Sequence, residues 1–183
     1  MIYFTADLHL GHANIIKHCN RPFKTVHEMD ITLLKNINVK VRENDTLYIV
    51  GDFAWWKCKQ DQLRAYRSQI LCKNIHLLLG NHDYPIKNKL LPLFSSVEDI
   101  KSLKIKDQKI ILCHYAMRTW NCSHHGAYHL YGHSHNNLRD DPYSLSFDIG
   151  VDGKDYNFSP LCFPEIQRIM EKKHWTPPFK DNK

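Results

Sequence analysis

Small groups of aspartate, asparagine and histidine residues recur between positions 7 and 135. In chain order they are Asp7-Leu8-His9, Gly51-Asp52, Gly80-Asn81-His82-Asp83, His114 and Gly132-His133-Ser134-His135. Carboxylate, amide and imidazole groups bind divalent cations, and carboxylates and imidazoles also act as acids and bases in catalysis. Taken singly, each group fits an ordinary turn or a buried histidine. Their chemistry therefore depends on whether the fold brings them together.

Each of these groups directly follows a short run of residues that predicts a β-strand. The runs cover residues 2–6, 46–50, 75–79, 109–113 and 128–131, and they are rich in β-branched, aromatic and leucine side chains. In α/β sheets the carboxyl ends of the strands meet at one edge, where ligands bind. The five groups are therefore predicted to form one site.

Helices are predicted between the early strands. Thr25 and Glu28 form a T-x-x-E capping box, after which apolar residues recur at helical spacing up to Val41. A second helix fits residues 61–71, and a third begins at Pro164 and runs to about residue 172. Further strands are predicted near residues 97–105 and 145–151. This order indicates an α/β fold with mixed sheets.

The composition is that of one globular domain. The chain has 183 residues, of which 43% are hydrophobic and 24% are charged, so disorder, collagen and coiled coil are excluded. This length predicts a single domain over residues 1–183, with residues 174–183 as a loosely ordered tail. Thirteen histidines against 25 lysines and arginines is the one unusual figure. The net charge of +6 favours anionic partners but falls short of a dedicated DNA-binding domain.

The sequence predicts a soluble, cytoplasmic protein without a membrane partner. No apolar run approaches the roughly 18 residues that would cross a bilayer, and the first residues, MIYFTADLHLGH, lack the pattern of a signal peptide. The six cysteines include no C-x-x-C pair, which disfavours a disulfide framework or a thiolate zinc site and favours reduced thiols. None of these features sets the oligomeric state.

In their order, the motifs D-x-H, G-D, G-N-H-D, H and G-H-x-H resemble those of the calcineurin-like metallophosphoesterase superfamily. The stretches FTADLHLGHANIIKHCNRPF, GDFA, GNHD and HLYGHSH look like those of its compact, single-domain bacterial and phage-type members. The resemblance implies a four-layer α/β/β/α sandwich with two mixed β-sheets. It also implies a site for two metal ions at one edge of the sheets.

The resemblance assigns most of the motif residues as metal ligands. Asp52 is the expected bridge between two divalent ions, which repel each other and need a shared anionic ligand. The remaining ligands would be Asp7, His9 and His135 for one ion and Asn81, His114 and His133 for the other. Mn²⁺ is favoured among the ions that suit these donors, with Zn²⁺, Fe and Ni²⁺ as alternatives.

The implied reaction is in-line attack on phosphorus by a hydroxide that bridges the metals. His82 is the expected proton donor or charge stabiliser for the leaving group. Asp83 is expected either to orient His82 or to stabilise the turn. His12 and Arg21 are the expected contacts to the substrate phosphate.

Residues around the motifs indicate the class of substrate. After Gly51-Asp52 the chain continues Phe53-Ala54-Trp55-Trp56 instead of the Asp-Arg-Gly of Ser/Thr protein phosphatases, which disfavours a phosphoprotein. These aromatic residues fit either stacking on a nucleobase or packing within the loop. An open site with a basic surround suits a phosphodiester, a nucleotide or an exposed nucleic-acid end. Asp148 and Asp152 fit either second-layer partners of the ligands or ordinary strand-end residues.

The predicted function is therefore that of a metal-dependent phosphodiesterase on nucleotide-like substrates. A nuclease or a phosphomonoesterase with the same two-metal site is an alternative. A non-catalytic metal-binding or nucleic-acid-binding module is a further alternative. A structural zinc site needs only four ligands, so seven candidate ligands together with His82 argue against that last reading.

Overall fold

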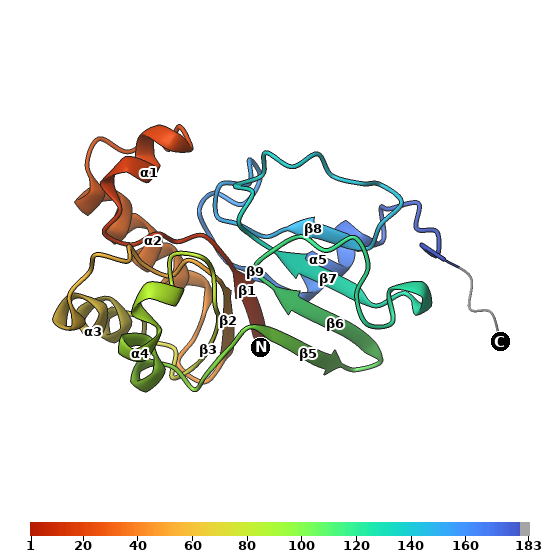
Figure 1. The fold of residues 1–183 in the computed structure, drawn as a ribbon, viewed down its shortest axis with the longest axis horizontal. Coiled ribbons are helices and arrows are strands. Elements are labelled where there is room, and N and C mark those ends of the chain that lie inside the picture. The colour runs from red at the N-terminus through yellow and green to blue at the C-terminus, as the bar shows by residue number, and fades with distance from the viewer. Residues whose placement is uncertain (180–183) are drawn as a thin grey trace.

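The computed structural model describes residues 1–179 and contains two β-sheets that pack face to face (Figure 1). The five-stranded sheet has the order β4-β3-β2-β1-β9 and the four-stranded sheet the order β5-β6-β7-β8. The strands are β1 (Ile2–Thr5), β2 (Thr46–Val50), β3 (Asn74–Leu78), β4 (Ser96–Glu98), β5 (Ile100–Ile105), β6 (Gln108–Cys113), β7 (Tyr128–Tyr131), β8 (Ser146–Asp148) and β9 (Leu161–Cys162). Only the β1–β9 and β5–β6 pairs are antiparallel, so both sheets are mixed, as predicted.

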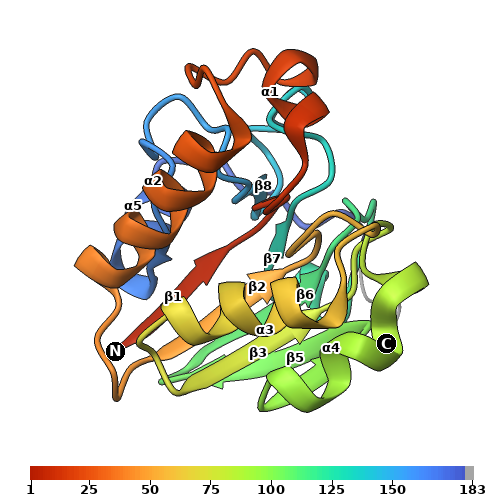
Figure 2. The same ribbon diagram turned by 90° about the vertical axis from the view of Figure 1, so that its left-hand side faces the viewer.

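Three helices cover the outer face of the five-stranded sheet, and a fourth lies beyond the edge at which β1 ends (Figures 1 and 2). The three are α2 (Val26–Lys40), α3 (Gln60–Gln69) and α4 (Lys87–Leu90), and the fourth is α1 (Ala13–His18). The fifth helix, α5 (Phe163–Met170), packs its apolar residues into the core between the two sheets. The predicted α/β arrangement of two mixed sheets flanked by helices is confirmed.

The central strands are buried on both faces, which explains their continuous apolar sequences. In β2, Leu47 and Ile49 face the helices, whereas Tyr48 and Val50 face the second sheet. A parallel strand that is covered on both sides has no polar face to present to water. β1, β2 and β3 are therefore shielded from water where they end, at the edge of the sheet that carries the site.

The outer face of the four-stranded sheet is covered by the chain after β6 instead of a long helix. His129 of β7 is fully buried there, and its Nδ1 lies 3.1 Å from the Ile111 carbonyl oxygen. The Met117 N–H donates to His129 Nε2 at 3.2 Å. His129 thus anchors this segment to the sheet, which gives a structural place to one histidine outside the motifs.

Helix ends differ from the predicted ones by at most two residues. Thr25 caps α2 as predicted, since its hydroxyl accepts from the Glu28 N–H at 3.1 Å. The Glu28 carboxylate, however, accepts from the Lys24 N–H and not from Thr25. Helix α3 spans 60–69 instead of 61–71, and α5 spans 163–170 instead of 164–172.

The predicted strand at 97–105 was wrong in one respect, because it is two strands in different sheets. β4 pairs with β3, β5 pairs with β6, and Asp99 between them carries the chain from one sheet to the other. β8 covers only the middle of the predicted 145–151 strand. The short helices between residues 84 and 93 were not predicted.

Part of the predicted tail is tied to the domain. The His174 N–H donates to the Pro142 carbonyl oxygen at 2.8 Å, and the Thr176 N–H donates to that of Tyr143 at 3.1 Å. Residues 180–183 of the predicted tail lie outside the described residues. Within the described chain, every helix is too short or too polar to cross a membrane.

Side chains in the core between the sheets are expected to stabilise the fold. Leu112 of β6 is fully buried in that core, so Leu112→Ala is expected to lower the free energy of unfolding by about 2–5 kcal/mol. The matched control, Leu138→Ala, removes a side chain that is 51% exposed and should change it by less than about 0.5 kcal/mol. Urea denaturation measures both; equal effects would contradict this description of the core.

Candidate metal centre

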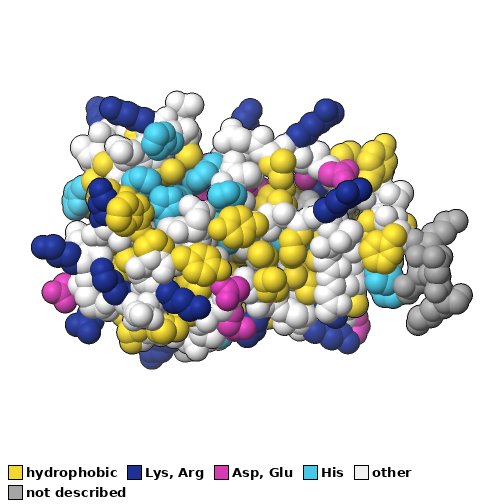
Figure 3. Space-filling view, viewed as in Figure 1, with side chains coloured by type: hydrophobic (Ala, Val, Ile, Leu, Met, Phe, Trp, Pro, Cys, Tyr) yellow, Lys and Arg dark blue, Asp and Glu magenta, His cyan; other side chains and the backbone are white. Residues whose placement is uncertain are grey.

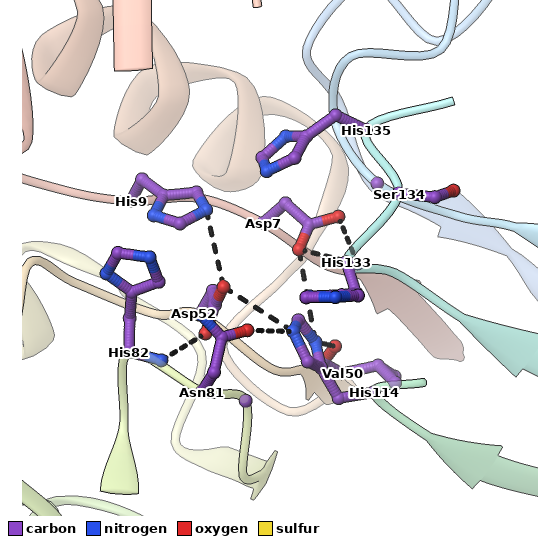
Figure 4. A network of polar contacts seen from close by, with 12 residues as sticks. Asp7, His9, Val50, Asp52, Asn81, His82, His114, His133, Ser134 and His135 are labelled. Carbon is purple, nitrogen blue, oxygen red and sulfur yellow. Dashed lines mark hydrogen bonds and ion pairs between the residues drawn. The ribbon is translucent and has the colours of Figure 1, made fainter. Parts of the chain in front are cut away.

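The seven predicted metal ligands come together at the carboxyl edge of the two sheets (Figure 4). Asp7 and His9 follow β1, Asp52 follows β2, and Asn81 follows β3. From the second sheet, His114 follows β6, and His133 and His135 follow β7. The parallel strands end at this edge, so one surface receives ligands from both sheets.

Asp52 lies at the centre of this group. Its Oδ2 is 3.4 Å from His9 Nε2 and 3.4 Å from His114 Nε2. Its Oδ1 accepts from the His82 N–H at 2.9 Å. One carboxylate therefore faces two imidazoles that come from different sheets, which is the arrangement that the bridging prediction requires.

One set of ligands gathers on the β1 side of Asp52. Ligand atoms of Asp7, His9 and His135 lie within 4.8 Å of one another. The rings of His9 and His135 stack with centroids 5.1 Å apart. Both Asp7 oxygens accept from the His133 N–H at 3.0 Å, which connects this set to the β7 loop.

A second set gathers around His114. Its Nδ1 lies 2.9 Å from the Val50 carbonyl oxygen, which can only accept, so Nδ1 carries a proton and Nε2 is the nitrogen that faces Asp52. Nε2 is 3.3 Å from Asn81 Oδ1. The His133 ring lies 5.2 Å from the His114 ring at the more exposed side of the site. Asp7 is also within reach, at 3.9 Å from His114 Nδ1.

Five of the ligands have left-handed backbone conformations that side-chain-bearing residues rarely adopt. Their φ angles are 58° for Asp7, 52° for His9, 56° for Asp52, 67° for His133 and 47° for His135. Each such residue costs on the order of 1–3 kcal/mol, and the surrounding structure must hold it in place. This strain is concentrated where the side chains are aimed at one point.

Two motif glycines are needed for space as well as for turns. A Cβ on Gly80 would lie 2.2 Å from Asp52 Oδ1, and one on Gly51 would lie 2.0 Å from His114 Nδ1. Any larger residue would displace a ligand. The glycines of G-D and G-N-H-D therefore make room for the ligands that follow neighbouring strands.

The two aspartates of the predicted ligand set have pKa values that are shifted in opposite directions. Burial raises the pKa of Asp7 to about 7, although His114 and His135 partly oppose this. Burial also opposes ionisation of Asp52, but the hydrogen bond and charge of His114, with the charge of His9, hold its pKa at about 2. A buried pair of carboxylates needs positive charge close by.

Arg21 acts behind the ligands and does not fit the expected phosphate contact. Its side chain is 4% exposed, and its Nε and Nη2 donate to Asp152 at 2.7 and 2.8 Å. Nη2 and Nη1 also donate to the carbonyl oxygens of Asp7 and Leu8. These bonds occupy the guanidinium with the protein itself, so it has no face for a substrate.

Asp152 connects Arg21 to a ligand. Its Oδ2 accepts from His135 Nδ1 at 2.7 Å. Burial alone would lower the pKa of His135, but the bonds to Asp152 and Cys19 outweigh it and raise this pKa to about 10. Asp152 is therefore a second-layer partner of His135, one of the two readings that the sequence left open.

Asp83 does not orient His82. Its Oδ2 accepts from the Asp52 and Gly80 N–H groups at 2.7 and 3.0 Å, and its Oδ1 accepts from the Phe53 N–H at 3.1 Å. Burial raises the pKa of Asp83 to about 7. The turn-stabilising reading is the one that the structure fits, and the turns it holds are those that carry Asp52 and Asn81.

Asp148 organises the G-H-S-H loop and is therefore a second-layer partner of the ligands, one of the two possibilities that the sequence left open. Its Oδ2 accepts from the Ser134 hydroxyl and from the Asn136 N–H at 2.9 Å, and its Oδ1 accepts from the Gly150 N–H at 2.7 Å. The sequence could not decide between the two possibilities, because an aspartate in or beside a strand is common in proteins where it has no such role.

Several buried histidine nitrogens have no hydrogen-bond partner among the described residues. They include both ring nitrogens of His9 and Nδ1 of His12 and His82. The three rings adjoin one another, with centroids 4.7 Å apart for His9–His82, 5.5 Å for His9–His12 and 5.3 Å for His12–His82. Unpaired imidazole nitrogens beside buried carboxylates are the donor set that a divalent cation completes, so the residues fit a metal.

The five motifs that resemble those of the calcineurin-like metallophosphoesterases therefore lie at one edge of two mixed sheets (Figure 4). The uncharacterized protein MJ1445 of Methanocaldococcus jannaschii is 32% identical to this chain over 176 residues, which cover 93% of this chain and 92% of that protein. The chain belongs to the same family as that protein.

A solved structure shares the fold. A protein of unknown function from Aquifex aeolicus, AQ665, is similar with a TM-score of 0.74 and 26% identity, over 92% of this chain and 98% of that chain. An archaeal phosphodiesterase is a more distant neighbour, with a TM-score of 0.47 and 17% identity over 81% of each chain. No protein-family model matches the chain.

The place of Arg21 predicts that it controls metal binding. Arg21→Lys keeps the charge but loses the paired bonds to Asp152, so Mn²⁺ affinity is expected to fall by about 10–100-fold. Arg118→Lys, at an exposed arginine, is the matched control and should leave the affinity unchanged. Isothermal titration calorimetry of both proteins tests this, with circular dichroism to show that each is folded. Equal affinities would contradict the positioning role.

Proposed function

We propose that this protein is a two-metal phosphodiesterase that hydrolyses nucleotide-like phosphate esters. The observation that carries the proposal is the place of Asp52, whose Oδ2 lies 3.4 Å from an imidazole nitrogen on either side. Two cations about 3.5–4 Å apart need such a shared anionic ligand. A single structural ion needs only about four ligands, so it would not account for all of the candidate ligands.

The ligands divide into two sets around Asp52. Asp7, His9 and His135 would hold one ion, and Asn81, His114 and His133 would hold the other. Two divalent ions, Mn²⁺ in the first instance, supply an activated water and offset the negative charge that develops on the phosphate. Zn²⁺, Fe and Ni²⁺ suit the same nitrogen and oxygen donors.

His82 is placed to protonate the leaving oxygen. Its backbone N–H is bonded to Asp52, and its ring adjoins a surface cavity that Trp56 and Pro85 also line. The ring thus lies beside the ligand His9, with centroids 4.7 Å apart, and borders the cavity in which a leaving group would lie, as a general acid requires.

His12 is placed to hydrogen-bond the substrate phosphate. Its ring stacks on Trp55 with centroids 5.6 Å apart and lies 5.3 Å from the His82 ring. Burial, together with the nearby His82, lowers the pKa of His12 to about 4. A neutral imidazole at this position contributes a directed hydrogen bond and no charge.

The six cysteines are all free thiols, which suits the expected reducing cytoplasm.

Metal-dependent turnover of bis-p-nitrophenyl phosphate tests the proposed activity. The wild type is expected to hydrolyse this diester with added Mn²⁺, faster than p-nitrophenyl phosphate, and to lose the activity with a chelator. Asp52→Asn removes the shared charge and should lower the rate by more than about a hundredfold. Release of p-nitrophenolate measures the rate. A protein that binds Mn²⁺ but hydrolyses neither ester would refute the proposal.

The role of His82 predicts a dependence on the leaving group. His82→Ala should lower the rate by roughly 10²–10⁴-fold on an ester with a poor leaving group, and by less on a p-nitrophenyl ester, which needs little protonation. His27→Ala, at an exposed histidine of α2, is the control and should have no effect. Full activity of His82→Ala on the poor leaving group would exclude the acid role.

A further inference from the structure

Two surface cavities adjoin the candidate metal centre. One, of about 430 Å³, is lined by His135 together with residues that include Asn20, Asn137 and Lys154. The other, of about 330 Å³, is lined by Trp56, Asn81, His82 and Pro85. Both are in the size range of small-molecule sites.

The two cavities lie on opposite sides of the ligand His9. Its ring is 4.7 Å from the His82 ring, which borders the smaller cavity, and 5.1 Å from the His135 ring, which borders the larger one. Figure 4 shows His82 and His135 on either side of the centre. A phosphorus atom at the centre would therefore have one cavity beside each of two ester oxygens.

The walls of the smaller cavity suit a flat aromatic group. Trp56 is 43% exposed, and Lys57 Nζ lies 5.0 Å from its ring centroid, within the range of a cation–π contact. Figure 3 shows hydrophobic side chains at the surface directly beside the histidines. An exposed indole next to a phosphate site offers a face on which a nucleobase can stack.

The walls of the larger cavity are polar. Asn20, Asn137 and Lys154 offer donors and acceptors for hydroxyl groups. The backbones of Asn20 and Asn136 have φ angles of 50° and 59°, and the Asn136 N–H is bonded to Asp148. The wall is thus preformed by the loops that also carry His135.

We propose that the substrate is an asymmetric phosphodiester, with a flat aromatic group such as a nucleobase against Trp56 and a hydroxyl-rich group against Asn137 and Lys154. This inference rests on the proposed phosphodiesterase function and specifies its substrate. A phosphate monoester has one organic group and would fill only one cavity. Trp56 and Lys154 are the specificity-determining residues.

Four phosphonate monoesters that carry each combination of groups test this inference. They are glyceryl phenylphosphonate, glyceryl methylphosphonate, methyl phenylphosphonate and methyl methylphosphonate, and calorimetry with the Mn²⁺-loaded protein measures their affinities. Glyceryl phenylphosphonate is expected to bind best. Trp56→Ala should weaken only the two phenyl compounds, by roughly tenfold, and Trp56→Phe should restore them. Lys154→Ala should weaken only the two glyceryl compounds.

Matched controls use residues away from both cavities. Trp175→Ala and Lys104→Ala remove an exposed indole and an exposed amine and should change no affinity. The inference is overturned if glyceryl phenylphosphonate does not bind, or if Trp56→Ala affects phenyl and methyl compounds alike. Hydrolysis of bis-p-nitrophenyl phosphate in that case leaves the proposed function intact. Failure of hydrolysis with selective binding overturns the function alone.

Discussion

The burial of Asp52 between two sheets is the constraint on which the rest of the site depends. An ionised carboxylate that is 1% exposed is unfavourable unless positive charge and hydrogen bonds surround it. Here His9 and His114 approach one oxygen, and the His82 N–H approaches the other. These contacts bring together loops that follow four different strands.

Residues in these loops have left-handed backbone conformations, which are unfavourable in isolated peptides. The backbone of Asp52 is left-handed, and Asp83 holds it there through bonds to three N–H groups. On the other side, Arg21 and Asp152 form a buried pair that fixes His135 and the carbonyl groups of β1's loop. The stability of the two packed sheets offsets this local strain, since each central strand is covered on both faces.

Sequence patterns predicted much of the frame, because they report local physics. Runs such as 46–50 are strands because they are apolar throughout, and Thr25 begins α2 because its hydroxyl accepts an orphan N–H. The strand predicted at 97–105 failed because pairing partners decide which sheet a strand joins. Asp99 separates residues that pair with β3 from residues that pair with β6.

Motif order and strand context were sufficient to predict which residues gather at the site, because strand ends in a parallel sheet meet at one edge. Sequence alone did not distinguish the roles of the charged residues. Arg21 was expected to contact the substrate, but it binds Asp152 and backbone carbonyl groups. For Asp83 the sequence left open whether it orients His82 or stabilises the turn, and the structure fits the turn. That difference depends on which way a side chain points in three dimensions, and on partners more than a hundred residues away, such as Asp152 for Arg21. Only the tertiary structure decides it, because hydrogen bonds between distant loops leave no local pattern in the chain.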